Sequence, residues 1–256
     1  MELLKAHIKG YSTKKGVYVP PHERKDRQAT LAEAPVHHHP RLGENGQKVI
    51  IKQPTHASSH TTWHNPSAVA TFVPDGDVPM TINGVAVRQW KDHPRTTEGW
   101  DYVDGVNDAM HEPPFHLPEG KNAASGVIVE EPDGRVWVIH PTNQFGGYQA
   151  SFPKGTAEPE LSLQANAIKE CFEESGLKVE ITGFIGDFER TTSVARMYRA
   201  KRVGGSPVHA GWETQAVSLV PKDKLYKLLN MWPDHPVAES IGAGKAPDKP
   251  SKKFIA

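Results

Sequence analysis

Apolar and polar residues follow regular patterns mainly after residue 121. Two runs rich in β-branched residues, 127–130 and 136–139, flank the sequence E-P-D-G at 131–134, whose turn-forming residues predict an antiparallel hairpin. Similar runs predict further strands over 179–184, 194–203 and 214–220. A short helix is expected over 222–231, and Pro233 with the polar tail predicts frayed ends over 233–256.

One segment has the spacing of an amphipathic helix. Its apolar residues recur at intervals of three and four, as in Ala165, Ile168 and Phe172. Ser162 can accept a hydrogen bond as the N-cap, and Gly176 can adopt the left-handed conformation that ends a helix. We therefore predict a helix over 163–175.

The first 75 residues show no sustained helical or strand period, because Pro, His, Ser and Thr separate their apolar residues. A poorly ordered, largely irregular arm is therefore expected over 1–75. The exception is a short hairpin around Lys15-Gly16, between Tyr11 and the run 17–19, which Pro20-Pro21 would end. Aromatic and aliphatic residues return over 76–121, so this extension is expected to pack on the core that follows.

Composition narrows the class of protein. The chain has 256 residues, 37% of them hydrophobic, which supports a globular core, and it has no apolar run long enough to cross a membrane. Its single cysteine excludes an intrachain disulfide, and Lys and His near the start interrupt any secretory segment, so we expect a cytoplasmic protein. Lys+Arg 30 balances Asp+Glu 30, so general attraction to nucleic acid or a membrane is not indicated. The oligomeric state stays open, a homodimer included.

Three carboxylates lie on one stripe of the predicted helix. Glu170, Glu173 and Glu174 are spaced i, i+3 and i+4. On an exposed helix such a trio is ordinary surface, since each like-charge pair costs only about 0.2 to 0.5 kcal/mol. If the trio is partly buried, two of these charges 4 Å apart repel by about 4 kcal/mol, and a counter-cation is required. Oxygen-only ligands of this kind suit Mg²⁺, with Mn²⁺ as the alternative.

The trio belongs to a longer motif. The sequence from Gly155 to Leu177 resembles the Nudix (MutT-type) hydrolase box, G-x5-E-x7-R-E-U-x-E-E-x-G-U, where U is aliphatic; seven of nine fixed positions match when Cys171 is accepted at the first U. The hairpin before the motif, the F-P-K-G sequence that leads into it and the W-E-T-Q-A-V-S-L-V-P segment after it also resemble this family. The resemblance implies an α+β fold, an α/β/α sandwich with a mixed sheet, over 122–232.

Two positions depart from the box. Leu161 stands where the family has Glu, and Lys169 stands where it has Arg. In the family these positions support the helix and orient the glutamates. We expect Glu160, one residue away, to substitute for the missing Glu, while Lys169 keeps the charge but not the planar two-pronged geometry of Arg.

The resemblance also implies a function: Mg²⁺-dependent pyrophosphohydrolysis of a nucleoside-diphosphate-X or related polyphosphate. It implies Glu170, Glu174 and the Gly155 carbonyl as metal ligands, with Glu173 as general base and as a further ligand. Glu189 and Glu213 are the reserve bases. Lys154, Arg190 and Arg196 are candidate phosphate contacts, although surface positions are expected more often than substrate contacts for such residues. For Phe145, Tyr148 and Phe152 we expect core packing rather than stacking on a base.

Other hypotheses remain open. The domain could be a catalytically weak Nudix module that binds a nucleotide or a partner through the arm, or the weakly basic arm could bind nucleic acid. The clustered histidines His37 to His39, and His56, His60 and His64, suggest zinc, but Ser, Thr and Asn-Pro disfavour a helix there and no cysteine is near, so a flexible arm is expected. The group X stays unidentified, because such pockets come from variable loops.

Overall fold

The computed structural model describes residues 6–8, 11–12, 18–19, 22–24 and 37–248. The chain divides into two compact units, 1–36 and 37–256. In the first unit β2 (Tyr11–Ser12) pairs antiparallel with β3 (Tyr18–Val19), which confirms the predicted hairpin in its described residues. A second pair, β1 (Ala6–Ile8) with β4 (His22–Arg24), places a strand after the two prolines that we expected to end the pairing. The predicted turn at Lys15-Gly16 lies outside the described residues.

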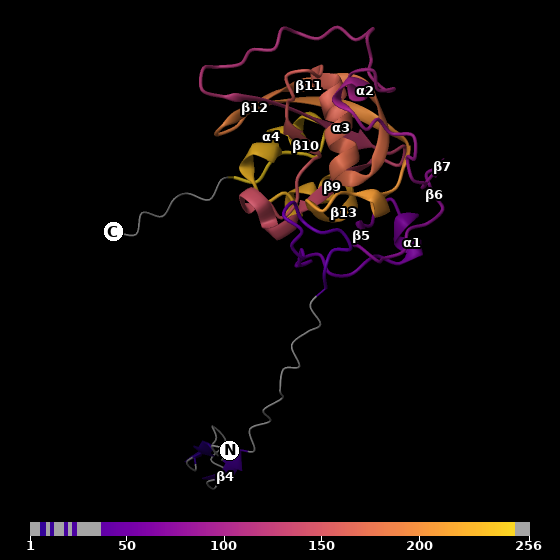
Figure 1. The fold of residues 1–256 in the computed structure, drawn as a ribbon. Helices are drawn as coiled ribbons and strands as arrows, with labels where there is room; N and C mark the ends of the chain where they lie inside the picture. The colour runs from indigo at the N-terminus through magenta and orange to yellow at the C-terminus, as the bar shows by residue number, and fades with distance from the viewer. Residues whose placement is uncertain (1–5, 9–10, 13–17, 20–21, 25–36, 249–256) are drawn as a thin grey trace. The chain divides into compact units, whose positions relative to one another are not determined.

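The second unit is built on a mixed sheet with the strand order β11-β12-β8-β9-β13-β5, and β10 pairs with β8 (Figure 1). Of these pairs only β8 with β12 is parallel. The strands are β5 (Ala70–Phe72), β8 (Asn122–Glu130), β9 (Arg135–Pro141), β10 (Lys154–Thr156), β11 (Leu177–Glu189), β12 (Ser193–Gly205) and β13 (Thr214–Pro221). The predicted strands are confirmed, and β11 and β12 run further than predicted because they pair with each other along most of their length.

The predicted helix is confirmed as α3 (Leu163–Ser175). The Ser162 side chain accepts a hydrogen bond from the Ala165 amide, and Gly176 ends the helix at φ 71°. A Cβ at Gly176 would lie 2.2 Å from the Ser206 carbonyl oxygen, so the position excludes any side chain. The predicted turn after β8 is also confirmed, with the Gly134 amide donating to the Glu131 carbonyl at 2.9 Å.

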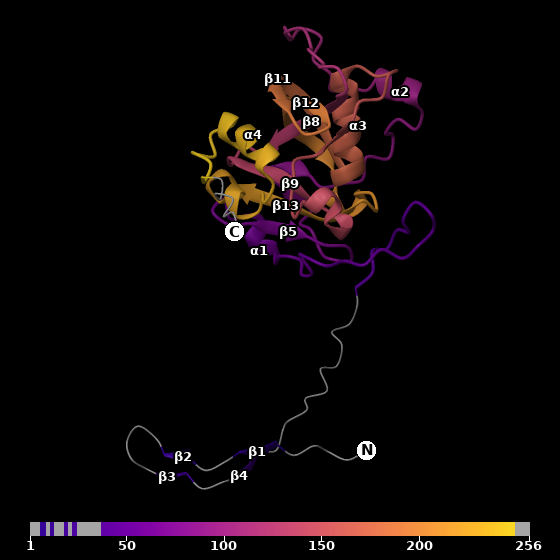
Figure 2. The ribbon, with the colours of Figure 1, turned by 90° about the vertical axis from the view of Figure 1, so that its left-hand side faces the viewer.

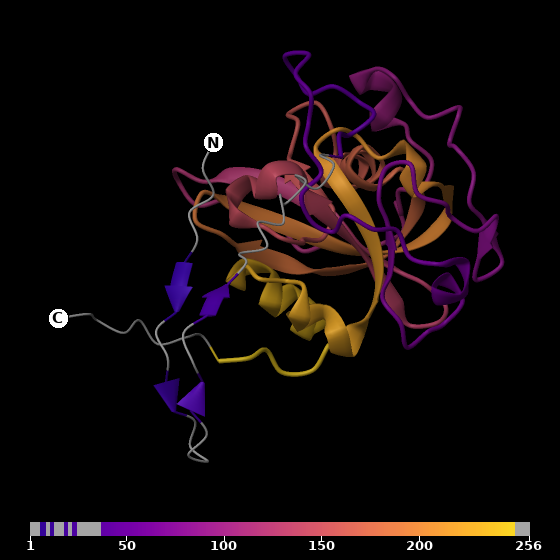
Figure 3. The same ribbon diagram turned by 90° about the horizontal axis from the view of Figure 1, so that it is seen from below.

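Helices cover both faces of the sheet. Figures 2 and 3 show α3 on one side and α4 (His235–Ser240) on the other. Alternate residues of β8 follow this division, since Val127 and Val129 pack in the core cluster that contains α3, whereas Ile128 packs in the cluster that contains α4. The expected α/β/α sandwich is therefore confirmed.

Residues 37–75 depart from the predicted irregular arm. β5 forms the edge of the main sheet, with Phe72 opposite Val217 of β13. Trp63, at the end of α1 (His60–Trp63), is fully buried, and its ring centroid lies 5.8 Å from that of Trp137. A strand of three residues and a helix of four are too short to produce a recognisable period, which is why the sequence pattern missed them.

The segment before β8 packs as an extension on α3. It contains the strands β6 (Thr81–Ile82) and β7 (Val85–Ala86) and the helix α2 (Thr97–Asp101). Trp90 and Trp100 are buried, and the Trp90 ring meets Phe172 of α3 edge-on, with ring centroids 5.2 Å apart. The extension therefore packs against α3 through Phe172 and joins the core cluster that contains this helix.

The C-terminal predictions were partly wrong. The expected helix over 222–231 is only a 3-10 helix, η3 (Lys222–Lys227). The expected frayed tail is ordered from 233 to 248, with a 3-10 turn, η4 (Trp232–Asp234), that leads into α4. Val237, Ala238 and Ile241 are buried against the sheet, so these apolar residues hold a segment that its prolines and glycines suggested would fray.

A buried histidine joins three strands. His140 of β9 lies 2.9 Å from the Gln149 carbonyl oxygen through Nδ1 and 2.8 Å from Ser218 Oγ through Nε2. Ser218 Oγ is also 2.8 Å from Thr71 Oγ1 of β5. Burial lowers the pKa of His140 from 6.5 to about 4, so the folded protein keeps this ring neutral.

We expect this histidine to make the fold acid-sensitive. Between pH 6.5 and about 4 an unfolded chain protonates His140 and the folded chain does not, so the free energy of unfolding falls as the pH drops through this window, by about 3 kcal/mol. Urea unfolding at pH 7.5, 5.5 and 4 should show a shallower decline for His140→Gln. The matched change at the exposed His116, His116→Gln, should leave the decline unaltered; an equal decline in His140→Gln would contradict the assignment.

Candidate active site

A fork in the sheet sets the geometry of the site. β8 and β9 pair only at Glu130 and Val136 and then separate. Residues 151–156 fill the opening: the Ser151 and Ile139 amides donate to each other's carbonyls at 2.9 and 2.8 Å, and the Val127 amide donates to the Pro153 carbonyl at 3.1 Å. The same segment then pairs with β8 as β10. The F-P-K-G sequence is therefore fixed between two strands of the sheet.

This placement brings Gly155 against the glutamates of α3. A Cβ on Gly155 would lie 2.2 Å from the carboxylate atoms of Glu170, so only glycine allows this approach. The amide of the preceding residue, Lys154, donates to Glu174 Oε2 at 2.7 Å. The structure thus brings Gly155, Glu170 and Glu174 together as the sequence predicted.

Both carboxylates are partly buried, and burial disfavours their charged form. Burial, with the added charge of Glu173, raises the pKa of Glu170 to about 7. Burial also raises the pKa of Glu174 to about 8; the Lys154 charge opposes the shift and Glu170 adds to it. Two such carboxylates are hard oxygen donors that suit Mg²⁺ or Mn²⁺. Within the described residues, no group of three or more Asp, Glu, His or Cys side chains is arranged so that it could hold a metal ion by itself.

Glu173 lies on the outer side of the trio. Its side chain is 48% exposed and its Oε2 is 2.8 Å from Lys169 Nζ. The same ammonium is 2.9 Å from Glu158 Oε1. Burial lowers the pKa of Lys169, but its hydrogen bonds to Glu173 and Glu158 outweigh that effect, and the pKa lies above its usual value.

Glu158, not Glu160, is the partner of Lys169. Glu160 is exposed, and Leu161, at the box position of the missing Glu, is 8% exposed in the core beside α3. The Glu158 amide donates to Asn166 Oδ1 at 3.0 Å, which ties this turn to the first part of α3. The expectation for Glu160 was therefore wrong, because the turn before the helix directs the earlier carboxylate towards Lys169.

The two reserve bases lie in different surroundings. Glu213 precedes β13, and partial burial with the charges of Glu173 and Glu44 raises its pKa. Glu189, at the end of β11, is 69% exposed and pairs with Lys121 at 3.1 Å. Of these two residues, only Glu213 therefore interacts with the trio.

The candidate phosphate contacts are largely engaged within the protein. Arg196 donates to both Asp187 carboxylate oxygens at 2.8 Å, and Arg190 donates to the buried Asp234 at 2.6 Å. Lys154 Nζ lies 2.6 Å from Ser151 Oγ and 4.9 Å from the centroid of the Tyr148 ring. Of these three residues, Lys154 is the one joined to the glutamate site, because its backbone amide donates a hydrogen bond to Glu174.

Among the aromatic residues near the site, Phe145 departs from the expected core packing. Phe152 is fully buried and Tyr148 is half-buried, but Phe145 is 83% exposed. It lies in a loop where Asn143 and Gln144 have positive φ, and the Thr142 amide anchors this loop to the Glu213 carbonyl at 2.7 Å. The unusual backbone turns the ring outward.

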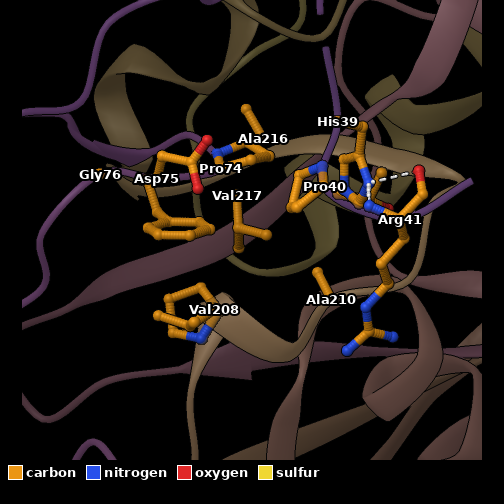
Figure 4. Close-up of a pocket in the computed structure, with 13 residues that line it drawn as sticks. His39, Pro40, Arg41, Pro74, Asp75, Gly76, Val208, Ala210, Ala216 and Val217 are labelled. Atoms are coloured by element: carbon orange, nitrogen blue, oxygen red, sulfur yellow. Dashed lines mark hydrogen bonds between the residues drawn. The ribbon is translucent and has the colours of Figure 1, made fainter. Parts of the chain in front are cut away.

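Sequence reasoning missed a cavity of about 330 Å³ (Figure 4). It is lined by the loop that contains His39 and Arg41, by the turn after β5, and by the start of β13. Two of these walls lie in the stretch that we had interpreted as an irregular arm. Their proximity to β13 follows from the pairing of β5, which no local sequence signal announced.

The chain is similar in sequence to one protein family and to several known proteins. A model of the NUDIX domain family matches residues 120–239. A MutT-like protein of Streptomyces ambofaciens is 30% identical over 115 residues, which cover 44% of this chain and 69% of that protein. An RNA pyrophosphohydrolase of Caulobacter vibrioides is 34% identical over 92 residues, 35% of this chain and 50% of that protein. A solved NUDIX hydrolase from Nitrosomonas europaea is 15% identical, with a TM-score of 0.42, and the match covers 49% of this chain and 91% of that one.

The family match and these relatives identify a hydrolase that acts on pyrophosphate bonds. The chain belongs to the Nudix hydrolase family. Among the described residues, no helix has the length and apolar character needed to cross a membrane.

The ion pairs of Lys169 predict a difference between two neighbouring glutamates. We expect Glu158→Gln to raise the Mg²⁺ concentration for half-maximal hydrolysis, or to lower the rate, by about 10- to 100-fold. Glu158 helps to fix the Lys169 ammonium, and this ammonium in turn holds the Glu173 carboxylate, so the change loosens Glu173. The free energy of unfolding should fall by less than about 1 kcal/mol, since the pair is partly exposed. The matched change Glu160→Gln should alter neither quantity. Equal effects of the two changes on hydrolysis would refute the role of Glu158.

Proposed function

We propose that the protein is a Mg²⁺-dependent pyrophosphohydrolase that cleaves the diphosphate linkage of a nucleoside-diphosphate-X or a related polyphosphate. The observation that carries the proposal is the convergence of Gly155, Glu170 and Glu174 at the fork of the sheet, with no space for a side chain at Gly155. A purely structural cluster would not require two partly buried carboxylates with raised pKa values beside a bare backbone.

Glu170, Glu174 and the Gly155 carbonyl are the groups that would hold the ion. A bound divalent cation would neutralise charge on the phosphoryl oxygens and lower the pKa of a water. Glu174 is oriented for this task by the Lys154 amide. The Glu170 carboxylate occupies the space that a Cβ at Gly155 would take, so it lies directly against that backbone. The ammonium of Lys154, which precedes Gly155, is the basic group that we assign to the phosphates.

The general base is Glu173 or Glu213. Glu173 is the choice by resemblance, but its carboxylate is engaged by the Lys169 ammonium at 2.8 Å. Glu213 lies beside the trio and has a raised pKa, the direction that suits a base near neutral pH. The proton acceptor must reach the attacking water, and both residues are exposed to solvent.

The alternative is a Nudix module that binds a nucleotide without turnover. The Nudix domain itself is common to both hypotheses, so only catalysis separates them. Hydrolysis of a panel of diphosphates, detected by coupled phosphatase, distinguishes the enzyme from the module. The Caulobacter relative is described as acting on RNA pyrophosphate, so a 5′-triphosphorylated RNA belongs in that panel with nucleoside-diphosphate sugars and dinucleoside polyphosphates.

We expect Glu174→Gln to abolish the response to Mg²⁺ without unfolding the protein. Removing a metal ligand should lower the hydrolysis rate by at least about 100-fold. The variant should match or exceed the wild-type thermal stability in EDTA, because a buried carboxylate has been replaced by a neutral amide. Millimolar Mg²⁺ should raise the melting temperature of the wild type and leave that of Glu174→Gln unchanged. An equal Mg²⁺ response in both proteins would contradict the ligand assignment.

A second comparison identifies the base. If Glu213 accepts the proton, Glu213→Gln should lower kcat by about 100-fold or more and flatten the acidic limb of the pH–rate profile, while Glu173→Gln should mainly weaken Mg²⁺ activation. The opposite result assigns the base to Glu173. Glu189→Gln is the matched control, since its carboxylate is exposed and paired with Lys121, and it should retain wild-type kinetics.

A further inference from the structure

The side chain of Lys154 belongs to a closed circle of five polar side chains, which we call the Asp234 cluster: Tyr148, Ser151, Lys154, Arg190 and Asp234. One half of the circle runs through Ser151. The Lys154 ammonium donates to Ser151 Oγ at 2.6 Å, and Ser151 Oγ donates to Asp234 Oδ2 at 2.8 Å. The 3-10 turn η4 at the C-terminal end of the domain is thereby linked to the segment inserted in the sheet.

The other half of the circle runs through Arg190, the residue that follows β11. Its guanidinium donates to Asp234 Oδ1 at 2.6 Å through Nη2, and to the Tyr148 hydroxyl at 3.0 Å through Nη1. The aromatic face of Tyr148 lies against the Lys154 ammonium, with Nζ 4.9 Å from the ring centroid, a distance at which a cation and an aromatic face attract. Lys154 is therefore held from two sides, and both lead to Asp234.

The chemistry of the donors fixes the direction of each hydrogen bond. An ammonium only donates, so the Ser151 hydroxyl accepts from Lys154 and has its single hydrogen left for another acceptor. That acceptor is Asp234 at 2.8 Å rather than the Phe152 carbonyl at 3.3 Å, because a bond to an ionised carboxylate is the stronger of the two. The charge of Asp234 thus orients the hydroxyl that receives the ammonium.

The cluster leaves one positive charge without a partner. Asp234 is fully buried and the Arg190 side chain is 9% exposed, so these two charges compensate each other in the interior. The remaining charge is that of Lys154, which is half-buried. Within the described part of the chain its ammonium makes one hydrogen bond, so two of its three N–H groups are available to an anion.

The available charge lies near the glutamate site. The amide of Lys154 donates to Glu174, and the ammonium opposes the rise that burial produces in the pKa of Glu174. A cation whose position is already fixed loses less conformational freedom when an anion binds than a mobile surface lysine does. The structure therefore provides a preorganised donor for a phosphate group.

We propose that Asp234 is a positioning residue for the hydrolysis, which holds the Lys154 ammonium in the orientation that binds the diphosphate. It acts on Lys154 through Ser151 on one side and through Arg190 and Tyr148 on the other. The inference rests on the proposed function, in which Lys154 contacts the phosphates. Arg190, which the sequence suggested as a phosphate contact, supports this cluster instead of touching the substrate.

The test is a double-mutant cycle in the kinetics of the diphosphate that the wild type cleaves fastest. Lys154→Met keeps the aliphatic stem and should raise KM by about 10-fold or more, with a smaller change in kcat. Ser151→Ala leaves Asp234 paired with Arg190, and it should raise KM by about threefold to tenfold, the value of one hydrogen bond. In the Lys154→Met background the same change should alter KM by less than about twofold, because its effect requires the ammonium.

Asp234→Asn should raise KM in the same direction as Ser151→Ala. If the loss of the carboxylate unfolds the protein, Ser151→Ala decides the question alone. Ser218→Ala is the matched control, because it removes another buried hydroxyl, one that bonds to His140 and Thr71. It should lower the melting temperature and leave KM unaltered.

The inference is overturned if Lys154→Met or Ser151→Ala keeps the KM of the wild type, or if Ser151→Ala raises KM equally with and without the Lys154 side chain. A wild type that cleaves no diphosphate contradicts the proposed function, and calorimetric binding of methylenediphosphonate in millimolar Mg²⁺ then tests the cluster. We expect the wild type to bind this probe at least threefold more tightly than Ser151→Ala. Equal binding by the two proteins, or no binding by the wild type, refutes the role of Asp234.

Discussion

The site depends on one constraint, the insertion of residues 151–156 between two strands that would otherwise pair. The main-chain bonds of Ser151 to Ile139 and of Val127 to Pro153 hold this segment on both sides. Gly126 makes the insertion sterically feasible, since a Cβ there would lie 2.3 Å from the Pro153 carbonyl oxygen. The backbone of Gly155 therefore reaches α3 as part of the sheet, with the rigidity of a strand rather than of a loop.

A lysine in place of arginine changes how the charge around the glutamates is balanced. A guanidinium would offer two parallel donors to one carboxylate, whereas the Lys169 ammonium is a point charge that reaches both Glu158 and Glu173. Leu161 takes the position of the missing box glutamate and joins the core instead. The two departures are thus coupled: the core gains an apolar side chain, and the negative partner moves three residues towards the N-terminus.

The sequence predicted those parts of the fold that local signals specify. Helix α3 agrees with the prediction at both ends, because Ser162 and Gly176 act within a few residues of the chain. The short strand β5 was not predicted, since it depends on pairing with β13, almost 150 residues away along the chain. The glutamate trio could be found from its spacing together with the motif around it, whereas the cavity could not. Glu158 was not assigned as the partner of Lys169, because the direction of a turn decides which side chain reaches that ammonium.

The segment before the matched Nudix region couples stability to the site. β13 is buried along its whole length and would be an apolar sheet edge without β5. Covering that edge fixes Phe72, and the chain on either side of β5 then supplies the turn at Asp75 and the loop at Arg41. The strand β5 protects the edge of the sheet and also forms part of the cavity wall. Removal of this segment would therefore expose β13.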